Sequence, residues 1–411
     1  MSTAKVTLQQ QSSAAVSTSA ADFSDAFTEV AKRRQNSPLR AMMPFLSVPG
    51  MISLGGGLPN PQTFPITKIT LEMNDGKQLQ VEGKELQSAL QYTLTSGFPP
   101  LQPLLAEILM KEHGTVVQGP ERSHEVTVTT GGQSGLARVF ELFLTDTESI
   151  LLDEAAYSGA LAFLRPLGCE LATVRTDDLG IIPDSLAEVL DTWPTDGSRG
   201  KRPRLLYTVP FGANPGGTSM TEERKRQIYE ICSRPENNIL ILEDDPYYFL
   251  QFRDDESAPK VPSFLSMDVD RRVVRFDSFS KVMSAGIRVG YCTAPPHITE
   301  RLRLHMQSTV LHTSALPQAV VAAILKDWTF DGFVQRTKEI TAFYKGQRDA
   351  FLASANKHLA PVGDGKITWT VPSAGMFVWI NLEGATSLSF EHESVVTRRR
   401  SPACCVPLCA V

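Results

Sequence analysis

Five short apolar runs constrain the fold of this chain more than any other feature of its sequence. Each is rich in β-branched residues or leucine, and most are followed by polar or glycine-containing turns. Continuous apolar runs of this length are typical of strands that are buried on both faces of a parallel sheet. The five runs are Val126–Thr129, Ser149–Leu152, Leu205–Val209, Ile239–Leu242 and Val273–Phe276.

Helical patterns lie between these runs, and the clearest covers Thr221–Cys232. Ser219 and Glu222 predict a capping box at its start, and Ile228 and Ile231 fall on one face of the helix. Strands that alternate with helices predict an α/β fold, with a mostly parallel sheet sandwiched by helices. Ligands of such sheets bind beyond the carboxyl ends of the strands, so we expect the chemically important residues directly after each strand.

A second, smaller α+β domain is expected after residue 318, because the pattern changes there. Helical periodicity continues through Trp328 and over Phe333–Leu352, and residues 369–382 predict a strand pair with a turn at Pro372–Gly375. The expected organisation is a flexible N-terminal arm (1–35), a segment that contributes to the substrate site and the small domain (36–65), a large domain (66–318), the small domain (319–382) and an irregular tail (383–411).

The composition excludes several classes of function. The 411 residues carry a net charge of -5 and no basic stripe, which argues against nucleic acid as a main partner. No apolar run is long enough to span a bilayer, so we expect no membrane partner. The cysteines show no paired CxxC spacing, so we expect free thiols and no metal site.

The first 21 residues are rich in Ser, Ala, Gln and Thr, and they contain no arginine. This composition predicts a disordered arm on a cytoplasmic protein. A mitochondrial transit peptide is the alternative, because such peptides are also rich in serine and poor in acidic residues, although they normally contain arginine.

The segment Asp277–Gly290 (DSFSKVMSAGIRVG) carries the strongest signal for chemistry. A lysine directly after a buried strand is costly unless its amine is used, and Lys281 could serve as a nucleophile toward carbonyl groups. Ser278, Ser280 and Arg288 are the kinds of group that would hold a phosphate beside it. The alternative is a surface loop with ordinary charges, and the full string favours the functional interpretation.

Acidic residues follow the preceding strand in the same way. Ile239–Tyr248 (ILILEDDPYY) runs from four aliphatic residues into Glu243, Asp244 and Asp245. A carboxylate such as Asp244 at the mouth of a strand can pair with a protonated ring nitrogen, as pyridoxal phosphate (PLP) requires, and Tyr247 could bond the phenolic oxygen of that ring. A solvated loop or a metal site are the alternatives, although the surroundings offer no histidine for a metal.

Three further elements are weak signals singly. Asn214 could donate to the same phenolic oxygen, although Asn-Pro-Gly is a common turn. Gly132 and Gln133 open a helix after a strand, where backbone N–H groups and the helix dipole favour an anion. Tyr157 could stack on an aromatic cofactor, although a tyrosine in such a loop more often packs in the core. Because all of these residues follow predicted strands, a single PLP site could collect them.

The chain resembles the kynurenine/2-aminoadipate aminotransferase family, a branch of the fold-type I PLP enzymes that includes fungal aromatic aminotransferases. The resemblance covers about residues 36–382, and its motifs fall in family order. The matching stretches are SLGGGLPNPQTFP (Ser53–Pro65), ALQYTLTSG (Ala89–Gly97), YSG at Tyr157, NPGG at Asn214, EDDPYYFLQF (Glu243–Phe252), PSFLSMDVD (Pro262–Asp270), DSFSK from Asp277 and PSAGMFVWI (Pro372–Ile380).

The resemblance implies a role for each of these residues. Lys281 would form the Schiff base with PLP and carry the proton, Asp244 would pair with the pyridine nitrogen, and Tyr157 would stack on the ring. Asn214 and Tyr247 would bind the phenolic oxygen. The phosphate would be held by Gly132, Gln133, Ser278, Ser280 and Arg288.

The resemblance also implies a homodimer with shared active sites, because Tyr92 would reach the phosphate bound in the neighbouring subunit. Arg40, Gly57 and Asn214 match positions near the substrate. The implied reaction moves the amino group of 2-aminoadipate, kynurenine or an aromatic amino acid to a 2-oxo acid such as 2-oxoglutarate.

Three departures from the family pattern stand out. Gly132 replaces a serine or alanine, Ala155 replaces a proline, and the resemblance stops after Leu382. Family members continue further, through a part that completes the small domain and carries an arginine for the substrate's α-carboxylate. The alternative hypothesis is therefore a PLP-binding pseudoenzyme or a form with low activity.

Overall fold

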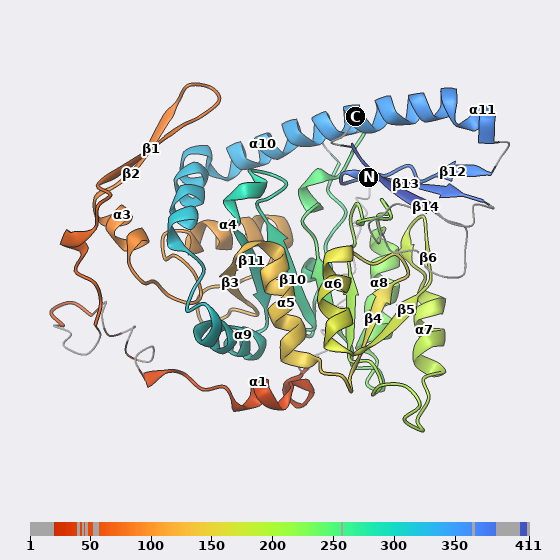
Figure 1. The fold of residues 1–411 in the computed structure, drawn as a ribbon, viewed down its shortest axis with the longest axis horizontal. Coiled ribbons are helices and arrows are strands. Elements are labelled where there is room, and N and C mark those ends of the chain that lie inside the picture. Colours follow the sequence, from red (N-terminus) through yellow and green to blue (C-terminus); the bar gives the residue numbers. More distant parts are fainter. Residues whose placement is uncertain are drawn as a thin grey trace, which may run out of the picture.

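A seven-stranded sheet forms the centre of the molecule, with helices packed on it (Figure 1). The computed structural model describes residues 20–38, 42, 45, 48–51, 57–255, 258–363, 366–383 and 403–408. The strands of the central sheet, in spatial order, are β3 (Glu125–Thr129), β11 (Gly290–Ala294), β10 (Val273–Ser278), β9 (Leu240–Asp244), β8 (Leu205–Thr208), β4 (Ser149–Asp153) and β5 (Glu170–Val174).

All neighbours in this sheet run parallel except β11, which is antiparallel to both β10 and β3. Strands β4, β8 and β9 are buried along their whole length, as their uninterrupted apolar runs predict. The predicted α/β fold with a mostly parallel sheet is confirmed. The sequence pattern does not reveal β11, because its residues GYCTA contain no aliphatic run.

The helices fill the connections between strands. α5 (Gly131–Phe143) packs on β10 and β11 and touches α6 (Ser158–Leu167) and α9 (Pro296–Thr309). α4 (Gln102–His113) packs on β3, and α7 (Pro183–Asp191) packs against α8 (Glu222–Ser233). None of the described helices is long and apolar enough to cross a membrane.

Helix α8 (Glu222–Ser233) matches the expected segment, but the predicted cap is wrong. Thr221 is the N-cap, and its Oγ1 accepts a hydrogen bond from the backbone N–H of Arg224 at 3.2 Å. The hydroxyl of Ser219 accepts instead from the backbone N–H of Gly212 at 3.0 Å. Both hydroxyls precede the helix, and the local sequence does not show that Ser219 is used by the preceding turn.

The C-terminal part of the chain begins with α10 (Ala315–His358), a long helix with non-helical backbone at Thr329. Figure 1 shows it running across the molecule toward a three-stranded antiparallel sheet of β12 (Ile367–Trp369), β13 (Phe377–Leu382) and β14 (Ala403–Pro407). The expectation of an irregular tail is therefore wrong for β14, whose five residues are too few to show a period.

The expectation of a flexible N-terminal arm is wrong for residues 20–35. The segment forms η1 (Ser24–Ala26) and α1 (Glu29–Arg33) and packs under the sheet (Figure 1). Phe27 is buried and stacks on Phe143 of α5, with ring centroids 4.8 Å apart. Two buried phenylalanines in this segment, Phe23 and Phe27, are what tie it to the large domain.

A hairpin of β1 (Lys68–Glu72) and β2 (Gln78–Glu82) projects from the body of the molecule (Figure 1). It continues into α3 (Gly83–Leu90), and both β2 and α3 contact α10.

Candidate active site

An anion cradle lies where β3 turns into α5. Gly131 begins the helix with φ +72°, and the side chain of the N-cap residue Thr130 does not cap the helix. A Cβ at Gly131 would overlap the guanidinium of Arg288. The helix start that carries the backbone N–H groups of Gly132 and Gln133 thus lies beside a cation, and the two together suit a phosphate group.

Arg288 is held in place by hydrogen bonds of its own. Its Nη1 donates to the hydroxyl of Ser280 at 3.2 Å and to the carbonyl of Ala285 at 3.1 Å. Its Nη2 donates to the carbonyl of Thr130 at 3.5 Å. The start of α5 and the turn that follows β10, which are distant in the sequence, therefore meet at one guanidinium.

Tyr157 lies at the start of α6, next to this cradle. The amide Nε2 of Gln133 donates to the carbonyl of Gly159 at 2.8 Å, which joins the starts of α5 and α6. A Cβ at Gly159 would fall 2.5 Å from the Tyr157 ring, so only glycine leaves room for the ring here. Burial and the negative charge of Asp244 raise the pKa of Tyr157, and the charge of Arg288 opposes this rise. The ring therefore lies within electrostatic reach of both groups.

Asp244 ends β9 as a buried carboxylate. The hydroxyl of Tyr207 on β8 donates to its Oδ2 at 2.8 Å. Burial raises the pKa of Asp244 to about 6; the charge of Asp277 adds to this rise, whereas the Tyr207 hydrogen bond and the charge of Arg275 oppose it. A Cβ placed on Gly132 would lie 3.9 Å from its Oδ1, so the carboxylate faces the start of α5. A buried carboxylate with a raised pKa is stabilised by a cation, such as a protonated ring nitrogen.

Lys281 lies in the turn that follows β10. The backbone N–H of Ser280 donates to the hydroxyl of Ser278 at 3.2 Å, and that of Phe279 donates to the carbonyl of Val289 at 3.1 Å. These bonds shape the turn so that Phe279 is buried and Lys281 is half-buried. Because β10 and β9 are parallel neighbours, with Phe276 opposite Asp244, Lys281 emerges at the same sheet edge as Asp244.

Asn214 and Tyr247 follow the ends of β8 and β9. Asn214 is half-buried and precedes a cis peptide bond to Pro215. Tyr247 is buried, and its ring centroid lies 5.8 Å from that of Phe377 in the small domain. Both residues therefore lie on the edge of the sheet that carries Asp244 and Lys281.

The remaining predicted residues are not gathered into this cluster. Tyr92 is 49% exposed and its ring meets that of His312 edge-on, with centroids 6.1 Å apart. Gly57 is exposed, with nothing within 4 Å of the position of a Cβ. Arg40 lies outside the described residues.

Two buried polar side chains next to the candidate site escape prediction from the sequence. Tyr207 is the hydrogen-bond partner of Asp244, and Arg275 is a fully buried cation in the middle of β10. A signal for each exists, because a tyrosine or an arginine inside an otherwise apolar strand needs a polar partner. The identity of that partner depends on strand order, which the sequence does not give.

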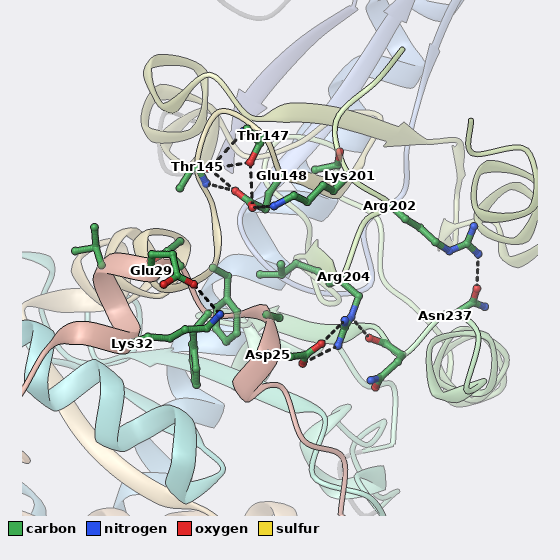
Figure 2. A pocket seen from close by; sticks show the side chains of 18 of the residues that line it. Asp25, Glu29, Lys32, Thr145, Thr147, Glu148, Lys201, Arg202, Arg204 and Asn237 are labelled. Carbon is green, nitrogen blue, oxygen red and sulfur yellow. Dashed lines mark hydrogen bonds and ion pairs between the residues drawn. The ribbon is translucent and has the colours of Figure 1, made fainter. Parts of the chain in front are cut away.

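A pocket of about 720 Å³ lies at the opposite edge of the sheet (Figure 2). It opens between α1 and the amino ends of β4 and β8, and several of its charged side chains form ion pairs. Arg204 lies 3.0 Å from Asp25, and Lys201 lies 2.9 Å from Glu148. Because α/β sheets bind ligands at the carboxyl ends of their strands, we place the active site at the other edge.

The residues at the carboxyl edge fit a phosphorylated aromatic cofactor. Glycine at position 131 keeps the cradle open, Arg288 supplies a cation, and buried Asp244 needs a cationic partner. A lysine at the same edge completes the set of groups that a PLP enzyme uses.

Comparison with known proteins gives the same class. The model of the family "Aminotransferase class I and II" matches residues 51–409. The bovine kynurenine/alpha-aminoadipate aminotransferase is 42% identical over 365 residues, which are 87% of this chain and 84% of that protein. The match extends beyond Leu382, where the sequence resemblance was expected to stop.

Solved structures agree. Aminotransferase Aro8 from Candida albicans superposes with a TM-score of 0.79 at 30% identity, covering 89% of this chain and 82% of that chain. The α-aminoadipate aminotransferase LysN from Thermus thermophilus, complexed with N-(5'-phosphopyridoxyl)-L-leucine, has a TM-score of 0.63 at 28% identity, covering 89% of this chain and 84% of that chain.

The chain belongs to the class I and II aminotransferase family. It is a PLP-dependent aminotransferase that acts on amino acids and 2-oxo acids. Nothing in these relatives favours a cofactor-binding pseudoenzyme.

Proposed function

We propose that this aminotransferase moves the amino group of 2-aminoadipate, kynurenine or an aromatic amino acid to a 2-oxo acid such as 2-oxoglutarate, with Lys281 as its catalytic lysine. The observation that carries the proposal is one sheet edge that holds a buried carboxylate, Asp244, a cationic cradle at Arg288 and Gly131, and Lys281 on the strand beside Asp244. The name of the bovine relative specifies kynurenine and α-aminoadipate, which supports these donors.

The cofactor-binding roles follow from the chemistry of each side chain. Arg288, the N–H groups of Gly132 and Gln133, and the hydroxyls of Ser278 and Ser280 bind the phosphate. Asp244 pairs with the ring nitrogen, and the O–H of Tyr207 orients the carboxylate by donating to Oδ2. When it is bound, PLP would supply the aldehyde carbon that carries the amino group and an electron sink for negative charge at the substrate's Cα.

The protein's own groups then control the proton. The amine Nζ of Lys281 would take the proton from Cα of the donor and deliver it to C4′ of the cofactor. Tyr157 packs on the ring and excludes water from one face, and Asn214 and Tyr247 donate to the phenolic oxygen. Gly57 and Arg40 belong to the substrate side of this proposal.

A homodimer is part of the proposal, because an exposed apolar surface surrounds Tyr92. Leu94 is 41% exposed, and Val310 and Leu311 are 45% and 41% exposed. The hydroxyl of Thr95 donates to the carbonyl of Leu311 at 2.9 Å, so the two segments lie side by side. An apolar surface of this kind suits a protein interface, across which Tyr92 would reach the partner's phosphate.

The compartment is proposed to be the mitochondrion rather than the cytoplasm, since the bovine, rat and mouse relatives are named as mitochondrial proteins. Imaging of a full-length fusion to a fluorescent protein tests this. Fluorescence that stays cytoplasmic would overturn it.

A donor panel tests the proposed reaction. Purified protein with PLP and 2-oxoglutarate should form glutamate from 2-aminoadipate, kynurenine or tyrosine, and should form none in the Lys281→Ala variant. Glutamate formation from none of these donors would refute the proposed substrates. Light scattering at several concentrations, with Leu94→Asp as the interface variant, tests the dimer in parallel.

A further inference from the structure

One buried arginine, Arg275, contacts residues that are adjacent in sequence to Asp244 and to Ser278 of the proposed site. Arg275 lies in β10 and is fully buried. Its Nη1 lies 2.9 Å from Asp245 and 3.1 Å from Glu243, and its Nη2 lies 2.9 Å from Asp277. Glu243 and Asp245 stand on either side of Asp244, and Asp277 directly precedes Ser278.

These contacts lie behind the site. Successive side chains of a strand point to opposite faces of the sheet, so Glu243 projects away from the face to which Asp244 projects. Arg275 pairs with Glu243 in the register of β10 and β9, and Phe276 pairs with Asp244. The guanidinium of Arg275 therefore holds the carboxyl ends of β9 and β10 from the face of the sheet opposite to Asp244.

The carboxylates extend this support into the backbone. Glu243 accepts hydrogen bonds from the backbone N–H groups of Phe264 and Leu265 at 2.7 and 3.1 Å. The backbone N–H of Asp245 donates to the carbonyl of Phe276 at 3.0 Å. Removing the guanidinium would leave three buried carboxylates without their ion-pair partner, which is strongly destabilising.

The same groups act on Asp244 through their charge. Tyr207 from β8 and Arg275 and Asp277 from β10 all act on the pKa of Asp244. Tyr157, at the start of α6, lies within electrostatic reach of both Asp244 and Arg288. Asp277 raises the pKa of Asp244, whereas Arg275 lowers it.

A second buried cation joins this network from α8. Lys225 donates to the carbonyl of Pro262 at 2.7 Å, and burial lowers its pKa to about 7 while Glu243 and Asp245 oppose that shift. Its amine also lies 3.5 Å from the centroid of the Phe211 ring.

We propose that Arg275 is a positioning residue of the aminotransferase site: its guanidinium clamps the carboxyl ends of β9 and β10 and so places Asp244 and the Ser278–Lys281 turn relative to each other. This inference rests on the proposed roles of Asp244 and Lys281. The clamp requires a planar group that can reach carboxylates on both strands, which lysine cannot reproduce because it offers a single nitrogen.

The chain offers a matched control on the same strand segment. Arg272 is also buried, lies 2.5 Å from Asp270, and donates to the carbonyls of Cys232 and Ile239 at 2.9 and 3.0 Å. It stands at the other end of β10, away from Asp244. Arg272→Lys therefore removes a buried arginine of similar environment without touching the clamp.

The test compares Arg275→Lys, Arg272→Lys and Asp277→Asn with the wild type. In the protein without PLP, hydrogen exchange of peptides covering residues 240–248 and 273–283 should become faster in Arg275→Lys, with β4 and β5 unchanged. The dissociation constant of PLP should rise at least about tenfold in Arg275→Lys and stay near the wild-type value in Arg272→Lys.

The Asp277→Asn variant supplies a readout that a merely structural role would not move. Removing this negative charge should shift the midpoint of the pH dependence of PLP binding to lower pH, by about 0.5 unit or more. Arg275→Lys that exchanges and binds like Arg272→Lys would overturn the clamp. If Arg275→Lys fails to fold, Asp277→Asn decides, because it removes the carboxylate that holds the guanidinium to β10. Unchanged hydrogen exchange of both peptides in that variant would overturn the inference.

Failure of the proposed function gives a different pattern. If wild-type protein binds no PLP through Lys281, the assignment of the site fails, whereas the hydrogen-exchange comparison on PLP-free protein still tests the clamp.

Discussion

Replacing Asp244 by asparagine should stabilise the protein without PLP and weaken its binding of PLP, two effects of opposite sign. Burial raises the pKa of Asp244 from its ordinary value of 3.8 to about 6. At about 1.36 kcal/mol per pKa unit, keeping this carboxylate charged inside the folded protein costs about 3 kcal/mol. A bound cation offsets this cost, because it stabilises the charged form of the buried carboxylate.

The pH dependence of this effect has a definite sign. The folded-state pKa lies above the unfolded-state value, so the folded protein binds the proton more tightly. The penalty is therefore absent below about pH 4, grows between about pH 4 and pH 6, and is complete above that window. Asparagine does not ionise, and its oxygen can still accept the hydrogen bond from Tyr207. The variant should gain up to about 3 kcal/mol near pH 7.5, roughly 4–6 °C in melting temperature for a domain of this size.

Thermal unfolding of PLP-free protein at pH 5 and pH 7.5, with a PLP titration at pH 7.5, measures both effects. Asp153→Asn is the control, because Asp153 ends the nearby strand β4 and burial raises its pKa to about 7, while it bonds Thr208 and not the proposed site. That variant should also be stabilised but should retain its PLP affinity. An Asp244→Asn protein that is less stable than wild type at pH 7.5, or that binds PLP equally well, would refute the reasoning.

Three further predictions follow from the same contacts. Gly131→Ala should lose about 1–3 kcal/mol of stability and most of its PLP affinity, because it forces an L side chain to φ +72° against Arg288. Gly114→Ala, at φ +66° with open space around it, should lose stability but keep its PLP affinity; denaturation and PLP titration compare the two. Tyr207→Phe removes a hydrogen bond that lowers the pKa of Asp244, so the pH midpoint of PLP binding should move upward in a titration series, and a downward shift would contradict the assignment. Phe27→Ala should lower the free energy of unfolding in urea by about 3–5 kcal/mol without changing PLP affinity, because the buried Phe27 ring stacks on Phe143. A decrease below about 1 kcal/mol would mean that the N-terminal segment does not stabilise the large domain.

The parallel strands could be predicted because strands that are buried on both faces have an uninterrupted run of apolar residues. Leu205–Thr208 and Leu240–Asp244 lie within a residue or two of their expected bounds. β11 could not be predicted, because GYCTA gains its burial from β10 and β3, which are its neighbours only in three dimensions.

The candidate site shows the same limit. Asp244, Ser280 and Arg288 were expected from their places after strands, and the structure brings Arg288 to Ser280 across eight residues. Tyr207 and Arg275 were missed, because each depends on a partner in an adjacent strand, and adjacency follows from strand order. The Thr221 cap was missed for a local reason, since two hydroxyls compete before α8 and only the turn geometry decides between them.

The visible absorbance of the purified protein with PLP tests the central claim most directly, measured for wild type and Lys281→Ala before and after adding 2-aminoadipate or kynurenine without any 2-oxo acid. The account predicts a visible band that is present only with Lys281 and is lost when the donor is added. A band that is unchanged in Lys281→Ala, or one that depends on Lys281 but persists with every donor tested, would contradict it.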